Sequence, residues 1–350
     1  MIKHKDWVRN IFRKKDREIS RYGKLCLDKN ERISSFEKKF FNKLISKISS
    51  DKFTYYPEVW TLYKALSKFH KLNKKQFVVT AGSDAAIKSC FELFVKKGDK
   101  VIVLNPTFAM VDIYCKIFRA KKINISYDEN LSLNINYLIK SITQKISLII
   151  IANPNSPTGT LISKKNMEKI IKKANLFKVP LLVDEAYFGF SNQTVLPLLK
   201  KYQNLILSRT FSKAYGLAGL RVGYIIANKA VAKLLFNLKP MYEVNSIGVL
   251  AATMILKNVK TYKQYINQTK QGLKFFTDYL KKNNISFIKT HANFIYINFG
   301  KKINYYYSKL YKKGIFTKPG VGIKGYENYL RITLGPKKEI KTVIKNLNKF

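Results

Sequence analysis

The chain has 350 residues, of which 46% are hydrophobic, so it can form one large domain or two smaller ones and is too apolar to be disordered. Its formal charge of +45 comes from lysines scattered in ones and twos, without a basic tail or zinc-finger spacing, which disfavours specific nucleic-acid binding and favours anionic substrates. The three cysteines and three histidines are isolated, which excludes a disulfide framework and a zinc site. The sequence shows neither a signal peptide nor a membrane span, so we expect a cytoplasmic protein with no membrane partner.

Short apolar runs alternate with helical patterns through the first two thirds of the chain. In chain order, the predicted strands are 77–80 before AGSDAA, 100–104 before NPTF, 147–152 before NPNSPTG, 179–183 before DEAY, 205–207 before SRTFSK, and 222–227. Helical patterns such as 85–96 and 164–177 lie between them. This alternation predicts an α/β fold with a mainly parallel sheet flanked by helices, which binds its ligand at the turns that follow the strands.

The pattern changes after about residue 245. A long helical stretch at 246–283 leads to the strand-like runs SFIKTHANFIYINF, GIFTKPG and YLRITLG, and then to a terminal helix from about residue 337. We therefore predict a large domain at 46–245 and a smaller α+β domain that combines 1–45 with 246–350.

The turn around Gly82 is a possible anion site. Gly82, Ser83 and Asp84 directly precede a predicted helix, and the unpaired N–H groups at a helix start attract anions together with the helix dipole. The alternative is that Ser83 or Asp84 only caps the helix.

Two further turns carry polar groups. Asp184 and Glu185 end a predicted strand, where a carboxylate could bind a metal, act as a base or hold a protonated ring nitrogen. Alternatively, Asp184 caps a helix and Glu185 is a solvated neighbour. No histidine is nearby, so a metal is disfavoured. The turn NPNSPTG has an ordinary turn composition, but its side-chain amides could also contact an oxygen on a ring.

Lys213 differs from the other lysines because of its neighbours. Lysine can form a Schiff base with an aldehyde, and here it follows the hydroxyls of Thr210 and Ser212 and precedes Arg221. Together with Asp184, these groups supply what pyridoxal phosphate needs: a lysine for the aldehyde, an acid for the ring nitrogen and donors for the phosphate.

In their order, these motifs resemble the fold-type I pyridoxal-phosphate aminotransferases of class I/II, and within them the histidinol-phosphate aminotransferase-like branch. The shared motifs are YYPE, GSDAAI, NPTFAM, NPNSPTG, DEAY, SRTFSKAYGLAGLRVGY and YLRITLG. The similarity covers nearly the whole chain and is most specific at 56–223. The resemblance implies the fold of this family, pyridoxal 5'-phosphate as cofactor, an amine donor and a 2-oxo acid acceptor as substrates, and a homodimer.

The resemblance also assigns roles to site residues. Lys213 would bind the cofactor aldehyde, Asp184 would pair with the ring nitrogen, Tyr187 would donate to the ring oxygen, and Arg331 would hold the acidic group of the substrate. The other implied cofactor contacts are Phe108 stacked on the ring, Ser83, Asp84, Ala85, Thr210, Ser212 and Arg221 around the phosphate, and Tyr56 reaching the phosphate in the partner subunit.

Three departures from the family pattern lie near the substrate. Ser156 stands directly before Pro-Thr-Gly, where asparagine is common, so either Asn155 or Ser156 could meet the ring oxygen. Asn30 is retained from the usual NENP motif without its proline. Lys318 replaces a second expected arginine, which keeps the charge but loses the bidentate fork. We predict Asn30, Lys318 and Arg331 as substrate-binding residues.

The reaction predicted from these features is transamination of a small phosphorylated amine or amino acid, with histidinol phosphate as the first choice and 2-oxoglutarate as acceptor. The alternative is decarboxylation of a phosphorylated amino acid of the phosphothreonine or phosphoserine type, because the sequence does not fix which bond lies perpendicular to the ring. A non-enzymatic basic binding protein would leave the seven ordered motifs unexplained.

Overall fold

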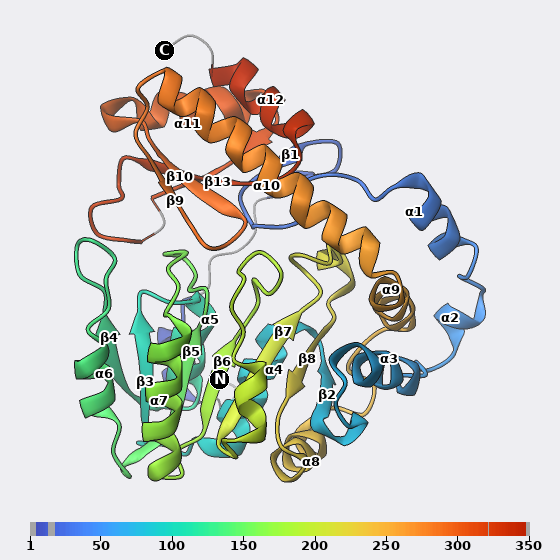
Figure 1. The fold of residues 1–350 in the computed structure, drawn as a ribbon, viewed down its shortest axis with the longest axis vertical. Helices are drawn as coiled ribbons and strands as arrows, with labels where there is room; N and C mark the ends of the chain where they lie inside the picture. Colours follow the sequence, from blue (N-terminus) through green and yellow to red (C-terminus); the bar gives the residue numbers. More distant parts are fainter. Residues whose placement is uncertain (1–4, 13–17, 321, 348–350) are drawn as a thin grey trace.

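A computed structural model gives the structure of residues 5–12, 18–320 and 322–347. The molecule has two bodies, a larger one around a seven-stranded sheet and a smaller one around an antiparallel sheet (Figure 1). The seven strands are, in spatial order, β2 (Phe77–Thr80), β8 (Gly223–Ile226), β7 (Leu205–Thr210), β6 (Leu181–Asp184), β5 (Ile146–Ala152), β3 (Lys100–Asn105) and β4 (Lys121–Ser126). β8 runs antiparallel to both neighbours and the pairs from β7 to β4 are parallel, which confirms the predicted mainly parallel sheet.

Both faces of this sheet are covered by helices. Along β5, Ile149 and Ile151 belong to the core on one face, whereas Leu148 and Ile150 belong to the core on the other. A continuous run of buried apolar residues is what a strand covered on both sides requires. The helices of this body include α3 (Trp60–His70), α4 (Gly82–Phe94), α5 (Ala109–Ile117), α6 (Ile135–Ser141), α7 (Lys164–Leu176) and α8 (Lys229–Leu238).

The edge strand β4 was not among the predicted strands. Its sequence, KKINIS, buries a single side chain, Ile125. Lysines on an edge strand discourage pairing with other chains, and they also remove the apolar run that identifies the interior strands. The strand pattern was therefore too weak to recognise.

The smaller body combines the two ends of the chain. Its antiparallel sheet has the order β12 (Lys318–Pro319), β13 (Tyr329–Thr333), β10 (Phe294–Asn298) and β9 (Phe287–Lys289), and α11 (Ile303–Lys312) and α12 (Lys337–Leu347) pack with it. In the N-terminal segment, β1 (Leu25–Cys26) pairs in parallel with β11 (Ile315–Phe316). Leu27 lies fully buried in the same core, so residues far apart in sequence form one body.

The predicted helix at 246–283 is two helices, α9 (Ser246–Lys257) and α10 (Val259–Lys282), because Asn258 leaves the helical conformation. Helix α9 packs in the core of the large sheet, as does α1 (Lys38–Ile45), which precedes the short α2 (Asp51–Thr54). On α10, the buried residues that belong to the core of the small body begin at Phe276. Core contacts therefore pass from the larger body to the smaller one within α10, and α1 contacts the core of the larger body. The predicted domain limit at residue 245 stays a prediction.

Candidate active site

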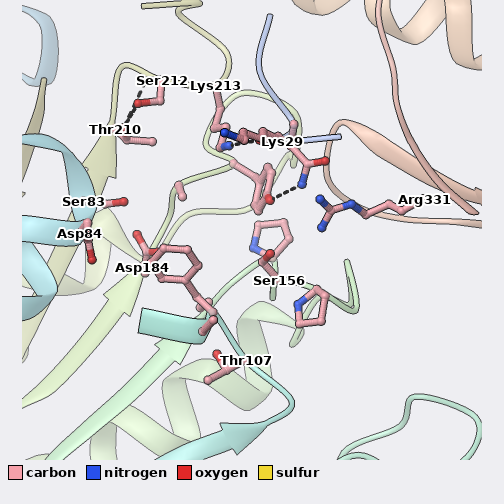
Figure 2. Close-up of a pocket in the computed structure, with 18 of the residues that line it drawn as sticks. Lys29, Ser83, Asp84, Thr107, Ser156, Asp184, Thr210, Ser212, Lys213 and Arg331 are labelled. Atoms are coloured by element: carbon pink, nitrogen blue, oxygen red, sulfur yellow. Dashed lines mark hydrogen bonds between the residues drawn. The ribbon is translucent and has the colours of Figure 1, made fainter. Parts of the chain in front are cut away.

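A cavity of about 540 Å³ lies where the turns after β2, β3, β5, β6 and β7 face the small body (Figure 2). Most of the predicted site residues line it. They are Asn30, Ser83, Asp84, Phe108, Ser156, Asp184, Tyr187, Thr210, Ser212, Lys213, Arg221, Lys318 and Arg331. The expected convergence of strand-end turns is therefore present in the structure.

One end of the cavity is a cup of hydroxyl and cationic groups at the start of α4. The Thr210 hydroxyl donates to Ser212 Oγ at 2.9 Å, and Arg221 Nη1 donates to the same oxygen at 3.2 Å. Ser83 lies in the first turn of α4, where unpaired backbone N–H groups and the helix dipole favour an anion. This arrangement suits a phosphate group.

Two glycines make the cup possible. Gly82 has φ +85°, and a Cβ there would lie 2.7 Å from Arg221 Nη2. A Cβ on Gly223 would lie 2.5 Å from the carbonyl carbon of Gly82. Any larger residue would push the guanidinium or the start of β8 away from the helix end, so the close approach depends on glycine at both positions.

Asp184 ends β6 and is 5% exposed. Burial raises the pKa of its carboxyl group to about 6, although a hydrogen bond of 2.8 Å from the Ser208 hydroxyl opposes the shift. A buried carboxylate is costly unless a cation pairs with it, and a protonated ring nitrogen would be such a partner. Asp184 therefore fits the predicted role of partner to the ring.

The next residue, Glu185, points away from the cavity into a buried ion pair. Its Oε2 accepts from Arg209 Nη2 at 2.8 Å, and the two side chains are 2% and 1% exposed. The centroid of the Phe188 ring lies 3.6 Å from the guanidinium carbon of Arg209. The alternative that Glu185 is a solvated neighbour is therefore wrong. The pair joins the ends of β6 and β7 on the face opposite Asp184.

Lys213 follows β7 and reaches the N-terminal segment. Its Nζ donates to the backbone oxygen of Lys29 at 2.8 Å. Burial, and after it the neighbouring Arg331, lower the pKa of the Lys213 amine to about 8. The direction agrees with the predicted effect of burial beside cations. An amine with this pKa exists in both protonation states near neutral pH.

Tyr187 and Asn30 are joined across the two bodies. Asn30 Nδ2 donates to the Tyr187 hydroxyl at 2.9 Å. The backbone of Asn30 has φ 57°, a left-handed conformation that asparagine tolerates, and its N–H donates to Thr333 Oγ1 at 3.1 Å. Asn30 therefore fixes the hydroxyl that is predicted to face the ring oxygen.

Asn155 and Ser156 occupy different places in the NPNSPTG turn. Asn155 is 1% exposed, and its Nδ2 donates to the Pro106 oxygen and the Thr158 hydroxyl, both at 2.9 Å. Its Oδ1 accepts from the Thr107 hydroxyl at 3.1 Å. Only Ser156 lines the cavity. Of the two candidates, Ser156 is the one in position to meet a ring.

The other end of the cavity belongs to the small sheet. Lys318 and Arg331 are register partners on β12 and β13, so their side chains are neighbours. Arg331 is 8% exposed and its Nη2 donates to the backbone oxygen of Asp28 at 2.6 Å. Its Nε is buried without a hydrogen-bond partner among the described residues. These two cations lie opposite the phosphate cup.

Three predicted residues do not line the cavity of this chain: Tyr56, Ala85 and Asn155. Tyr56 is 71% exposed and stacks on Tyr242 with ring centroids 3.8 Å apart. Eight cavity residues were not predicted, and two of them, Lys29 and Thr107, carry polar side chains. Thr107 belongs to the NPTF turn already singled out, whereas Lys29 had no signal that separated it from other lysines.

The groups in this cavity are those that pyridoxal phosphate requires, and they lie at the carboxyl ends of the strands, where open α/β sheets bind ligands. The cup fits the phosphate, Asp184 fits the ring nitrogen and Lys213 fits the aldehyde, so the fold and the site define a pyridoxal-phosphate-dependent enzyme. The model of the family "Aminotransferase class I and II" matches residues 35–347. The chain therefore belongs to the class I and II aminotransferases, with pyridoxal 5'-phosphate as its cofactor.

Similar proteins agree with this assignment. The histidinol-phosphate aminotransferase of Clostridium novyi is 32% identical over 347 residues, which cover 96% of this chain and 96% of that protein. The Sinorhizobium meliloti histidinol-phosphate aminotransferase, solved in complex with pyridoxal-5'-phosphate, has a TM-score of 0.80 at 20% identity, covering 92% of this chain and 91% of that one. L-threonine-O-3-phosphate decarboxylase from Porphyromonas gingivalis has a TM-score of 0.76 at 21% identity, with coverage of 93% and 99%. The two solved structures share the fold.

Proposed function

We propose that the chain transfers the amino group of a small phosphorylated amine, histidinol phosphate, to 2-oxoglutarate. The observation that carries this proposal is a cavity with two cationic ends. Arg221 lies at the phosphate cup, and Arg331 with Lys318 lies at the opposite end. One anion site suits the cofactor, and the second suits a substrate that is itself anionic. The name of the Clostridium novyi relative supports the choice of histidinol phosphate.

The residues of this chain have separable tasks in that reaction. When bound, pyridoxal phosphate supplies an aldehyde for the substrate amine and a conjugated ring that accepts the electrons of the breaking bond. Ser83, Thr210, Ser212 and Arg221 would hold its phosphate, Asp184 its ring nitrogen, and Phe108 would stack on the ring. Lys213 Nζ, with a pKa of about 8, takes a proton from the substrate carbon and returns one, as a general base and acid.

The proposal includes a homodimer in which Tyr56 reaches the cofactor phosphate of the partner subunit. Exposed apolar side chains near Tyr56 support an interface here: Phe53 is 71% exposed, Trp60 54% and Met241 76%. Surface patches of this kind are typical of protein–protein contacts.

We also propose that the enzyme works in the cytoplasm. Cys26, Cys90 and Cys115 are free thiols, as expected in a reducing compartment. No described helix is both long enough and apolar enough to cross a bilayer.

The test is an absorption spectrum of the purified holoenzyme before and after addition of histidinol phosphate, without an acceptor. We expect the cofactor band to convert to that of the pyridoxamine form and to return when 2-oxoglutarate is added. An unchanged band would refute histidinol phosphate as substrate. Carbon dioxide release from phosphothreonine or phosphoserine, without any need for 2-oxoglutarate, would instead establish the decarboxylase alternative.

A further inference from the structure

Ser208 lies directly behind the acid that faces the cofactor ring. Asp184 and Ser208 are register partners at the ends of β6 and β7, so their side chains point to the same face of the sheet. Asp184 lines the cavity, whereas Ser208 is 0% exposed and does not line it. A ligand in the cavity therefore meets Asp184, and Ser208 can influence it only through Asp184.

The two oxygens of the Asp184 carboxylate have different surroundings. Oδ1 accepts from the Ser208 hydroxyl at 2.8 Å. Within the described part of the chain, this is the one hydrogen bond that the carboxylate accepts, and Oδ2 has no partner there. One oxygen is thus held by the neighbouring strand, and the other is left for a ligand in the cavity.

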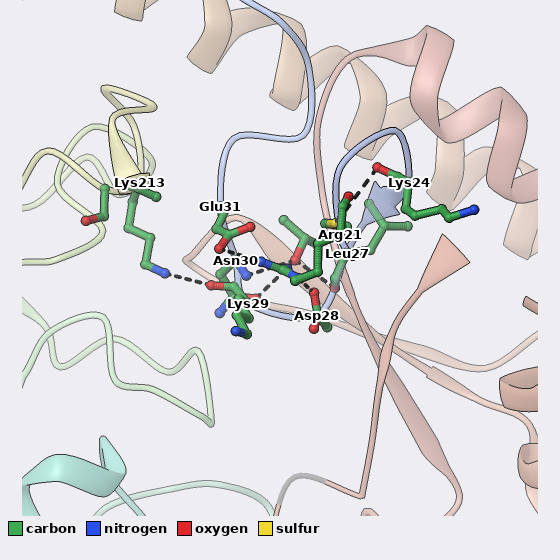
Figure 3. A network of polar contacts seen from close by, with 12 residues as sticks. Arg21, Lys24, Leu27, Asp28, Lys29, Asn30, Glu31 and Lys213 are labelled. Atoms are coloured by element: carbon green, nitrogen blue, oxygen red, sulfur yellow. Dashed lines mark hydrogen bonds and ion pairs between the residues drawn. The ribbon is translucent and has the colours of Figure 1, made fainter. Parts of the chain in front are cut away.

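The nearest cation does not share this task. Lys213 Nζ donates its hydrogen bond to the backbone oxygen of Lys29 at 2.8 Å, on the side of the N-terminal segment (Figure 3). Lys213 therefore acts on Asp184 through its charge, without a hydrogen bond that would orient the carboxylate. The orientation of the carboxylate comes from Ser208.

The surroundings of Asp184 oppose its ionisation. Burial raises the pKa of its carboxyl group to about 6, and the charges of Glu185 and Asp84 raise the pKa as well. The hydrogen bond from Ser208 opposes this rise more strongly than the charge of Lys213 does. Ser208 is therefore the main group that favours the carboxylate over the neutral acid.

The protonation of this carboxyl group matters for the cofactor. A carboxyl group and a pyridine nitrogen within hydrogen-bond reach share one proton, which leaves either a carboxylate with a protonated ring or two neutral groups. A hydrogen-bond donor to the carboxylate favours the first arrangement. The protonated ring is the stronger acceptor for the electrons of a breaking bond.

We propose that Ser208 is a positioning residue for the cofactor. Its hydroxyl holds Oδ1 of Asp184, directs Oδ2 to the ring nitrogen and keeps the shared proton on that nitrogen. The inference depends on pyridoxal phosphate as the cofactor and not on the identity of the substrate.

The experiment locates the proton without any substrate. The holoenzyme is loaded with pyridoxal phosphate that carries ¹⁵N in the ring, and the nitrogen chemical shift is recorded by solid-state NMR at neutral pH. This shift differs between a protonated and a neutral pyridine nitrogen. We expect the protonated form in wild type. In Ser208→Ala, we expect the signal to move toward the neutral form and the dissociation constant of the cofactor to rise about tenfold, as for the loss of one hydrogen bond to a charged group.

Further variants separate the hydroxyl from the space that it fills. Ser208→Thr keeps the hydroxyl and should keep the wild-type shift. Ser208→Cys has nearly the size of serine but only a weak donor, so its shift should lie between those of wild type and Ser208→Ala. It also tests the inference if threonine does not fit this buried site. Ser89→Ala is the matched control, because Ser89 is a buried serine of α4 outside the cavity lining and its loss should leave the shift unchanged.

The nitrogen shift distinguishes positioning from a purely structural role. A structural role would lower the melting temperature and weaken cofactor binding in Ser208→Ala, with the proton still on the ring nitrogen. An unchanged shift in Ser208→Ala would therefore overturn the inference, whatever happens to stability. If histidinol phosphate fails to react while the shift moves as expected, the proposed substrate is refuted and the role of Ser208 stands.

Discussion

The two ends of the cavity are built in different ways. We call one the cofactor end, formed by Ser83, Asp184, Thr210, Ser212 and Arg221, and the other the substrate end, formed by Lys29, Asn30, Lys318 and Arg331. The cofactor end lies at the ends of adjacent strands of one sheet. Asp184 and Ser208 are register partners on β6 and β7, and the next residue of each strand, Glu185 and Arg209, form a buried ion pair. The substrate end is assembled from a two-residue strand, its neighbour β13 and an N-terminal segment held largely by backbone contacts.

This difference indicates a division of labour. Side chains on buried strand ends are held rigidly, so changes at the cofactor end should alter the chemical step. The substrate end combines a short edge strand, its neighbour β13 and a docked segment, and its cations contribute mainly charge, so changes there should alter binding. If the comparison is correct, substitutions at the cofactor end lower kcat and substitutions at the substrate end raise KM.

The largest effect is expected from Lys213→Ala. It removes both the group that binds the cofactor aldehyde and the proton carrier, so we expect turnover to fall by about 10⁴-fold. The measurement is single-turnover absorbance with histidinol phosphate. Lys200→Ala, which changes an exposed lysine, is the matched control and should keep full activity. Substantial turnover in Lys213→Ala would refute the mechanism.

A smaller loss is expected from Asp184→Asn. The amide has nearly the same size but cannot hold a protonated ring nitrogen, so kcat should fall by about 10³-fold while the substrate KM changes little. Steady-state kinetics measure both parameters. Asp278→Asn, which changes an exposed residue of α10, is the matched control for the same substitution away from the cavity. If KM rose and kcat stayed constant, the division between the two ends would be wrong.

At the substrate end, Arg331→Lys should act on binding. The guanidinium offers two parallel donors to an anion and lysine offers a point charge, so we expect KM for histidinol phosphate to rise about tenfold with kcat within about threefold. Lys318→Arg, at the register partner of Arg331, introduces a guanidinium with two parallel donors and should not raise KM. A large fall in kcat in Arg331→Lys would mean that this arginine orients the reacting bond.

The comparison also explains what could be predicted from the sequence. A fixed cofactor demands a lysine, an acid and a phosphate cup at strand ends, and the predicted residues Lys213, Asp184 and Ser212 do line one cavity. The edge strand β4, the place of Lys29 in the cavity wall and the ion pair of Glu185 were not predicted. They depend on tertiary contacts between distant segments, such as the bond from Lys213 to the Lys29 backbone, which leave no local pattern.

The pKa of Lys213 predicts a pH dependence at the boundary of the two ends. Only the neutral amine attacks an aldehyde, so covalent attachment of pyridoxal phosphate to apoenzyme should speed up about tenfold per pH unit below pH 8 and level off above it. Stopped-flow absorbance between pH 6.5 and 10 measures this. Arg331→Met removes a cation that lowers this pKa and should move the plateau to higher pH, whereas Arg331→Lys should not. A plateau only above pH 10 in wild type would contradict a lowered pKa.

The smallest effect compares two adjacent residues of one turn. Ser156→Ala removes a hydroxyl from the cavity wall, so we expect the apparent pKa of the cofactor absorption band to rise by about 0.5, with the melting temperature unchanged. Asn155→Ala removes three buried hydrogen bonds and should cost about 1–3 kcal/mol of unfolding free energy. Spectral titration and denaturant unfolding measure the two quantities. Asn155 lies behind the cavity wall, so we expect Asn155→Ala to shift the pKa of the absorption band by less than Ser156→Ala does. If the spectral shift belonged to Asn155→Ala alone, the residue that meets the ring oxygen would be Asn155, and the turn would have to open when the cofactor binds.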